Sequence, residues 1–239
     1  MKQNRAFFFF GAVFLSCTLL FSAVFRVCLQ QLETEIPTNG SSIRDSPVII
    51  LDAGHGGEDG GATGTNGVLE KDLNLTVTNT LAALLRLSGY TVVETRTEDK
   101  LLYTEGTKKG HKKQSDLENR LFFTTQYEQC LLISIHMNTF PDTFCQGAQV
   151  WFSPNHPTSR ELGERIQNRI TNLVQQDNHR RIKEATSGIY ILRHAQVPAV
   201  LIECGFLSTP SDCERLCTPE YQKKLVLAIF DAIVKKTEL

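Results

Sequence analysis

The sequence predicts a single α/β domain with a mainly parallel, twisted sheet and helices on both faces, preceded by an N-terminal membrane helix. The chain has 239 residues, which is enough for one such domain and an appendage. Short β-branched runs alternate with stretches of helical spacing, a pattern typical of parallel sheets. The first apolar run is far longer than the others, which sets it apart from the domain.

That first run extends from Ala6 to Phe25 and follows the basic residues Lys2 and Arg5. About 20 apolar residues at 1.5 Å per residue match the thickness of the hydrocarbon core. A cleaved secretory signal would have a shorter apolar region and a good small-residue cleavage site. Ser22 and Ala23 form only a poor site of this kind, so an uncleaved anchor is favoured over a cleaved signal.

We therefore predict an anchor or signal segment over residues 1–29, a polar linker over residues 30–46 and a folded domain over residues 47–239. Positive charges at the N-terminus stay in the cytoplasm, so the domain is expected on the extracytoplasmic side of the membrane, or released if the signal is cleaved. The net charge of −1 offers no strongly basic face, so no nucleic-acid partner is expected.

The first half of the domain reads as strand, loop, helix and strand. Val48–Leu51 is a short apolar run that leads into a glycine-rich loop, as expected of a buried strand. A helix is predicted from Glu70 to the stop at Gly89, because apolar residues recur at helical spacing: Leu73, Val77, Leu81, Leu84 and Leu85. Thr91–Thr95 is the second predicted strand.

The second half continues the alternation of strands and helices. Thr158 and Glu161 have the spacing of a capping box and predict the start of an amphipathic helix. Pro219, directly behind Thr218, predicts the start of the last helix. Three further apolar runs predict strands: Leu131–Ile135, Ala148–Phe152 and Ala199–Ile202.

Four polar residues fall where ligands bind in such sheets, beyond the carboxyl ends of the strands. His55 follows the first strand, Glu70 begins the next helix, and His136 and Glu203 each end a predicted strand. Two histidines and one carboxylate are a common catalytic zinc set. We therefore predict Zn²⁺ on His55, Glu70 and His136. Glu203 then acts as the catalytic carboxylate that moves the proton of a water.

Other interpretations of these residues stay open on spacing alone. His55 could be a loop histidine, Glu70 could only stabilise a helix N-terminus, and His136 could be a hydrogen-bonded core residue. A cysteine hydrolase is a second possibility, with Cys204 as the nucleophile and His136 or His194 as the base. The seven cysteines show no C-x-x-C pair, so most of them are interpreted as small apolar residues.

Ordered motifs run through the whole predicted domain. The first is Leu51–Ala62, LDAGHGGEDGGA, followed by Leu69–Lys71. Ser134–Asn138, SIHMN, and Pro198–Phe206, PAVLIECGF, follow in the same order. Together these motifs resemble those of the zinc-dependent N-acetylmuramoyl-L-alanine amidases. The resemblance covers about residues 48–236, and it is much more specific than any one motif.

The resemblance implies zinc on His55, Glu70 and His136, with Glu203 as the catalytic carboxylate. It implies peptidoglycan as the substrate, cut between N-acetylmuramic acid and L-alanine. The subgroup that the chain is most similar to is the spore-cortex amidases of endospore formers. These act in the forespore or cortex space on the way to muramic δ-lactam and germination, and some depend on a lipoprotein partner. A catalytically inactive wall-binding or activator protein on the same scaffold is the alternative outside enzymes.

Some features depart from the family pattern or lack a role. Ala53 replaces the usual proline after the first aspartate, and Thr124–Thr125 replaces an Ala-Asn pair. Arg96 and Asn138 are secondary candidates for structural support of the site. The basic loop Lys108–Lys113 is interpreted as a solvated surface, with a contact to anionic lipid or wall polymer as the alternative.

Overall fold

The computed structural model describes residues 46–142 and 144–235. The predicted anchor, residues 1–29, and all but the last residue of the predicted linker, residues 30–46, lie outside these described residues. Within the described ranges, no helix combines the length and the apolar character needed to span a bilayer.

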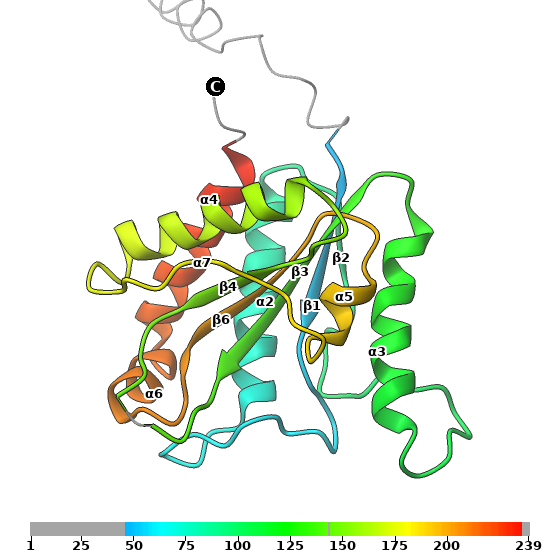
Figure 1. Ribbon diagram of the computed structural model, residues 1–239, viewed down its shortest axis with the longest axis horizontal. Coiled ribbons are helices and arrows are strands. Elements are labelled where there is room, and N and C mark those ends of the chain that lie inside the picture. Colours follow the sequence, from blue (N-terminus) through cyan, green and yellow to red (C-terminus); the bar gives the residue numbers. More distant parts are fainter. Residues whose placement is uncertain (1–45, 143, 236–239) are drawn as a thin grey trace, which may run out of the picture. The chain divides into compact units, whose positions relative to one another are not determined.

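The described residues form one α/β domain around a mixed, six-stranded sheet (Figure 1). The strand order is β2-β1-β3-β6-β4-β5, and only the β4–β6 pairing is antiparallel. The mainly parallel sheet predicted from the sequence is therefore confirmed. The strands are β1 (Val48–Ala53), β2 (Val92–Glu94), β3 (Cys130–Asn138), β4 (Gln149–Phe152), β5 (Lys183–Glu184) and β6 (Ala199–Phe206).

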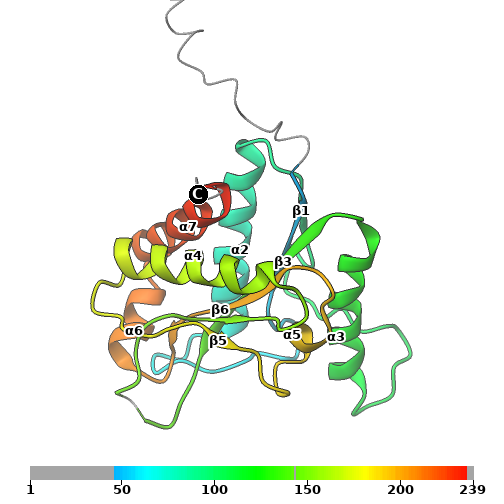
Figure 2. The same cartoon turned by 45° about the horizontal axis from the view of Figure 1, so that its top comes forward.

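Helices cover both faces of the sheet, as predicted (Figures 1 and 2). One face packs against α2 (Glu70–Leu87), α4 (Thr158–Leu173) and α7 (Pro219–Val234), whose apolar residues build the larger core. The short α6 (Pro210–Leu216) joins this side. The smaller core on the other face includes residues of α5 (Tyr190–His194), which lies beside α3 (Lys112–Phe122) and the 3₁₀ turn Phe123–Gln126.

Most predicted elements appear at the expected positions, because their apolar periodicity reflects real burial. The helix from Glu70 ends before Gly89, whose φ of 90° suits a residue without a side chain. The last helix begins at Pro219 behind Thr218. The strands that carry His136 and Glu203 extend past these residues, to Asn138 and Phe206.

The predicted capping box of α4 is wrong. Pro157 occupies the N-cap position in a helical conformation, and no side chain caps the helix there. The basic loop was also misread in part, since α3 begins at Lys112. Its sequence has no apolar stripe because the residues that it buries are Asp116 and Arg120.

Candidate metal centre

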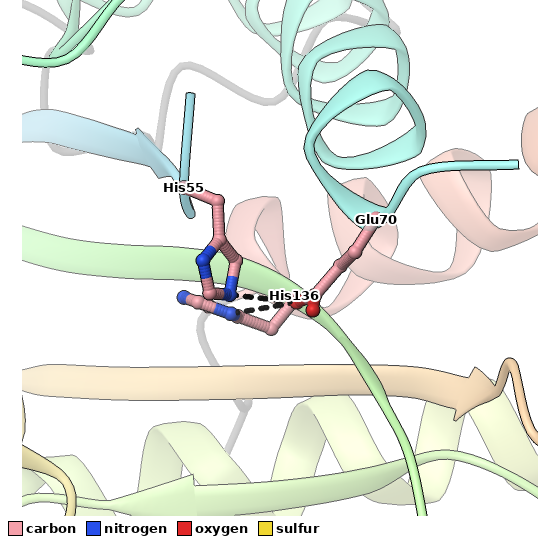
Figure 3. Close-up of side chains that lie close together, drawn as sticks. All are labelled: His55, Glu70 and His136. Carbon is pink, nitrogen blue, oxygen red and sulfur yellow. Dashed lines mark hydrogen bonds and ion pairs between the residues drawn. The ribbon is translucent and has the colours of Figure 1, made fainter. Parts of the chain in front are cut away.

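Three of the four predicted site residues converge at the carboxyl ends of the parallel strands (Figure 3). His55 comes from the loop after β1, Glu70 is the first residue of α2, and His136 lies in β3. Glu70 Oε1 lies 3.3 Å from His55 Nε2 and 3.0 Å from His136 Nδ1. One donor atom from each residue lies within 4.8 Å of the other two.

The glycine residues of the loop allow this convergence, because side chains at their positions would clash with His136 and Glu70. A Cβ at Gly54 would lie 2.1 Å from His136 Cε1, and one at Gly61 would lie 2.5 Å from Glu70 Oε2. His55 itself has a φ of 62°, an uncommon conformation for a residue with a side chain. Such backbone strain persists only where the surroundings hold it in place, and here they do.

Two buried arginines hold the loop by its carbonyl groups. Arg96 donates to the carbonyl oxygens of Ala53 and Gly54, each at 2.9 Å. Arg120 donates to the carbonyl oxygens of Ala53 and His55, each at 2.7 Å. These hydrogen bonds fix the backbone of the loop that carries His55. Arg96 was predicted as a supporting residue, whereas Arg120 was not.

Arg120 is itself fixed by two buried carboxylates. Its guanidinium pairs with Asp52 at 2.6 Å and with Asp116 at 2.7 Å. Asp52 also accepts hydrogen bonds from Ser134 at 2.6 Å and Thr95 at 2.7 Å. Burial would raise the pKa of Asp52, but the charge of Arg120 and these hydrogen bonds lower it to about 2. Asp52 is therefore ionised and fully partnered.

Glu70 is held by several donors that aim its carboxylate at the two histidines. Oε2 accepts a hydrogen bond from the Ala62 amide at 2.8 Å, and Oε1 accepts one from the Met137 amide at 3.1 Å. Burial alone would raise the pKa of Glu70, yet His136 and His55 hold it well below the usual carboxylate range. Glu70 is therefore an anionic ligand candidate with a fixed geometry.

His55 is oriented by Asp59, four residues further along the loop. Nδ1 of His55 lies 2.9 Å from Asp59 Oδ1, which leaves Nε2 directed at Glu70. Asp59 also pairs with Lys113 at the start of α3. Burial lowers the pKa of His55, but Asp59 and Glu70 outweigh it and raise the pKa to about 9. A carboxylate on the outer nitrogen is a common support of a metal-binding histidine.

Glu203 lies beside this cluster on the neighbouring strand. It is the register partner of His136 in the parallel β3–β6 pair, so both side chains leave the same face of the sheet. Its Oε2 is buried and has no hydrogen-bond partner among the described residues. Burial raises the pKa of Glu203 to about 7; His136 opposes this rise and Glu70 adds to it. An orphaned buried carboxylate oxygen is costly unless a ligand occupies the site.

The donor set fits a zinc ion. Ligands about 2.0–2.1 Å from a tetrahedral ion lie about 3.3 Å apart, close to the observed separations around Glu70 Oε1. Two imidazole nitrogens and one carboxylate oxygen are a usual catalytic set for zinc. In this arrangement His55, Glu70 and His136 can hold the ion, and Glu203 is placed to act on a molecule bound beside it.

The geometry argues against the cysteine alternative. Cys204 follows Glu203 in β6, so its side chain points to the opposite face and packs in the core with α2 and α7. Burial raises the pKa of its thiol far above the usual range, which keeps it protonated. His194 is exposed, stacks on Tyr190 and bonds the carbonyl of that residue, so it is not brought to the thiol.

Two other predicted features have structural roles. Asn138, a secondary candidate, ends β3, and its carbonyl accepts a hydrogen bond from the Leu207 amide at 2.8 Å. In the basic segment, Lys112 pairs with Glu58 at 2.9 Å, and Lys113 pairs with Asp59. These lysines attach α3 to the glycine-rich loop, so a purely solvated surface was an incomplete interpretation.

Comparisons with known proteins identify the family of the chain. The sequence pattern of the N-acetylmuramoyl-L-alanine amidase family matches residues 49–235. The chain therefore belongs to the N-acetylmuramoyl-L-alanine amidase family, as its motifs predicted.

Among individual relatives, the germination-specific N-acetylmuramoyl-L-alanine amidase of Bacillus subtilis is 36% identical over 189 residues, 79% of this chain and 78% of that protein. The structure of the CwlD amidase from Clostridioides difficile in complex with the GerS lipoprotein is 37% identical, with a TM-score of 0.75, over 79% of this chain and 96% of that chain. The amidase AmiC2 of Nostoc punctiforme is 28% identical, with a TM-score of 0.67, over 82% and 98% of the two chains.

Proposed function

We propose that this amidase is zinc-dependent, with the ion held by His55, Glu70 and His136, and that Glu203 is its catalytic carboxylate. The reaction is hydrolysis of the amide bond between N-acetylmuramic acid and L-alanine in peptidoglycan. The observation that carries the proposal is the convergence of three zinc-type donor atoms beside a buried carboxylate oxygen without a partner. Together the two features match the parts of a hydrolytic zinc site, a ligand set and a nearby proton acceptor.

A zinc ion in this position would polarise the carbonyl of the scissile amide and make a nearby water more acidic. Glu203 takes a proton from the water as the water oxygen attacks the carbonyl carbon. The carboxylate then passes this proton to the amide nitrogen, the carbon–nitrogen bond breaks, and the free amine of L-alanine departs. In the metal-free protein, burial raises the pKa of Glu203 to about 7, and a carboxylate with a raised pKa is a better proton acceptor than an ordinary one.

Rigid support of the site contributes to the rate in a second way. Arg96 and Arg120 hold the loop of His55, and Asp59 holds its ring, so the donors need little rearrangement when substrate binds. A site that is already organised for the charge of the transition state loses less energy to reorganisation.

We further propose a spore-cortex role, in which the cut precedes muramic δ-lactam formation and hence germination. The similarity to the germination-specific amidase of B. subtilis and to C. difficile CwlD supports this role. The N-terminal residues 1–29 are proposed to anchor the domain on the extracytoplasmic side of a membrane, in the forespore or cortex space. Since the CwlD structure is a complex with the GerS lipoprotein, a lipoprotein partner is proposed here as well.

The alternative of an inactive wall-binding protein is disfavoured by the site itself. Inactive proteins on enzyme scaffolds typically lose a ligand, whereas all three donors and Glu203 are present and close together. Binding of the cell wall alone would not require a buried carboxylate oxygen without a hydrogen-bond partner, such as Glu203 Oε2.

The test is hydrolysis of purified muropeptides by the full chain supplied with zinc, followed by mass spectrometry. We expect free stem peptides with an L-alanine N-terminus, and none from Glu203→Gln. Glu164→Gln, a change in an exposed ion pair with Arg160, serves as the matched control and should keep full activity. Zinc-loaded, folded protein that releases no peptide would favour the wall-binding alternative.

A further inference from the structure

Arg180 contacts Gln149, the residue of β4 that pairs with Glu203 across the sheet. Gln149 of β4 is the register partner of Glu203 in the antiparallel β4–β6 pair, so the two side chains lie side by side on one face. Arg180 Nη1 donates to Gln149 Oε1 at 3.0 Å. The Arg180 guanidinium also stacks on Phe206, at 4.6 Å from the ring centre, beyond Glu203 in the same strand. Arg180 therefore borders the proposed reaction site.

The position of Arg180 is fixed by neutral groups only. Nε donates to the Gln146 carbonyl at 2.9 Å, and the Arg180 amide donates to Asn178 Oδ1, also at 2.9 Å. Asn178 in turn donates to the Ala148 carbonyl at 2.8 Å. The backbone at Arg180 is thereby tied to the loop that leads into β4, so little side-chain freedom is lost when a ligand binds.

This guanidinium has no anionic partner in the described part of the chain. The acceptors of Nε and Nη1 are a carbonyl and an amide oxygen, and Nη2 has no acceptor among the described residues. The buried Arg120, by contrast, is paired with Asp52 and Asp116. A partly buried arginine that is fixed, stacked and unpaired is suited to bind a carboxylate from outside the protein.

We propose that Arg180 binds a carboxylate of the stem peptide of the substrate and thereby selects an acidic peptide. The inference rests on the proposed function, because it takes the scissile amide to lie beside Glu203. In that amide the carboxyl group of the muramoyl unit is already used, so the free carboxylates of the substrate belong to its peptide. Arg180 is a specificity-determining residue and takes no part in proton transfer.

The spacing agrees with a residue close to the cut. Gln149 lies one strand spacing from Glu203, and Arg180 is one hydrogen bond further, so the guanidinium lies within roughly 10 Å of Glu203. An extended peptide advances about 3.3–3.6 Å per residue, so the second or third residue of the stem peptide reaches Arg180. The L-alanine that is released would lie between the two groups.

The experiment compares two muramyl tripeptides, one with all peptide carboxylates free and one with all of them converted to carboxamides. The zinc-loaded full chain is expected to prefer the acidic form. Arg180→Met should raise KM for the acidic form about 10- to 100-fold, the usual effect of losing a hydrogen bond to a charged group, with kcat nearly unchanged. On the carboxamide form the same variant should match the wild type. Arg180→Lys should recover part of the difference.

Arg181→Met is the matched control, because this neighbouring side chain is exposed and has no ion pair among the described residues. It should behave as the wild type on both peptides. Binding of the acidic tripeptide to Glu203→Gln, with and without Arg180→Met, measures the same contact by calorimetry without turnover.

Distinct results separate the two proposals. If the wild type cleaves both peptides equally well, or if Arg180→Met impairs both to the same extent, the carboxylate contact is refuted while the amidase function stands. If the folded, zinc-loaded wild type cleaves neither, the proposed function fails and the inference fails with it. The acid preference of the wild type needs no substitution, so a variant that does not fold leaves this comparison in place.

Discussion

The two faces of strands β3 and β6 carry different chemistry, although both strands are mainly apolar in the sequence. One face presents side chains such as Ile135, Ile202 and Cys204 to the core beneath α2, α4 and α7. The other face carries His136 and Glu203 beside the glycine-rich loop. Successive residues of a strand point to opposite faces, so a structural thiol and the proposed catalytic carboxylate are adjacent in sequence but separated by the sheet.

The difference between the two faces explains how a buried sheet can support a polar site. The apolar face fixes the strands, and the polar face uses this rigidity to hold charged groups that water would otherwise solvate. Changes on the apolar face should therefore cost stability with little effect on activity. Changes on the polar face should act mainly on activity or metal binding, except where a charge is left buried without a partner.

The largest effect is expected at Glu203. Glu203→Gln keeps the shape of the side chain but cannot accept a proton, so kcat should fall about 10²- to 10⁴-fold. Zinc content and melting temperature should stay near the wild-type values, because the group is not a proposed ligand. Steady-state hydrolysis of a muramyl peptide, with metal analysis of the same sample, measures both. Near-normal turnover in the zinc-loaded variant would refute the catalytic role.

The second largest effect, on stability, is expected at Asp52, a charged residue of the polar face that takes no part in the proposed reaction. Asp52→Asn leaves Arg120 with only one of its two carboxylates, and we expect a loss of about 3 kcal/mol in the free energy of unfolding. Urea unfolding measures this loss. Glu164→Gln, in an exposed ion pair with Arg160, is the control and should cost less than about 1 kcal/mol.

The same aspartate predicts a pH dependence. Its pKa is about 2 in the folded state, below the ordinary value of 3.8, so its contribution to stability is present above about pH 4 and is lost as the pH falls toward 2. In Asp52→Asn this part of the pH dependence should disappear. An unchanged slope between pH 4 and 2 would show that Asp52 is not the group responsible.

A smaller effect is expected at Asp59, which acts through His55. Asp59→Asn should weaken zinc binding about 10- to 100-fold without a matching fall in the melting temperature of the metal-free protein. Lys113→Met should have a weaker effect in the same direction, and Lys109→Met, which changes a lysine with no described ion pair, should have none. Competition with a chelator of known affinity measures all three. Equal zinc affinities in the wild type and Asp59→Asn would refute the proposed role of Asp59 in orienting His55.

The smallest effect is expected on the apolar face. Cys204→Ala should cost about 1 kcal/mol in stability, because a small buried side chain is lost from the core. Its kcat/KM should stay within about twofold of the wild type, a change well below 1.4 kcal/mol. Complete loss of activity in a folded Cys204→Ala protein would instead revive the cysteine hydrolase.

A site residue could be predicted from the sequence where the residues around it indicate a strand or helix and its end. The four site residues were predicted because each lies at or just beyond the end of a strand or helix predicted from its apolar residues: His55, Glu70, His136 and Glu203. The carboxyl ends of parallel strands lie at one edge of the sheet. Their convergence in the structure follows from that rule. Their roles as ligands and base stay predictions.

Of the supporting residues, Arg96 was predicted, whereas Arg120 and Arg180 were not, because the side chains that hold these two lie far away in the chain. Arg120 is buried in a polar helix since Asp52, 68 positions earlier, needs a partner. Arg180 is held by Gln149 and by the ring of Phe206, and nothing in its own neighbourhood marks it. Only Asp59 left a local signal, four residues after His55 within the glycine-rich motif.

The proposed mechanism depends on zinc binding by His55, Glu70 and His136, and elemental analysis of the purified full chain measures this binding. After reconstitution and removal of free metal, we expect about one zinc per chain, as for a three-ligand catalytic site. Glu70→Ala should bind much less, and Glu161→Ala should bind as much as the wild type. Folded wild-type protein that takes up no zinc under these conditions would refute the proposed zinc site.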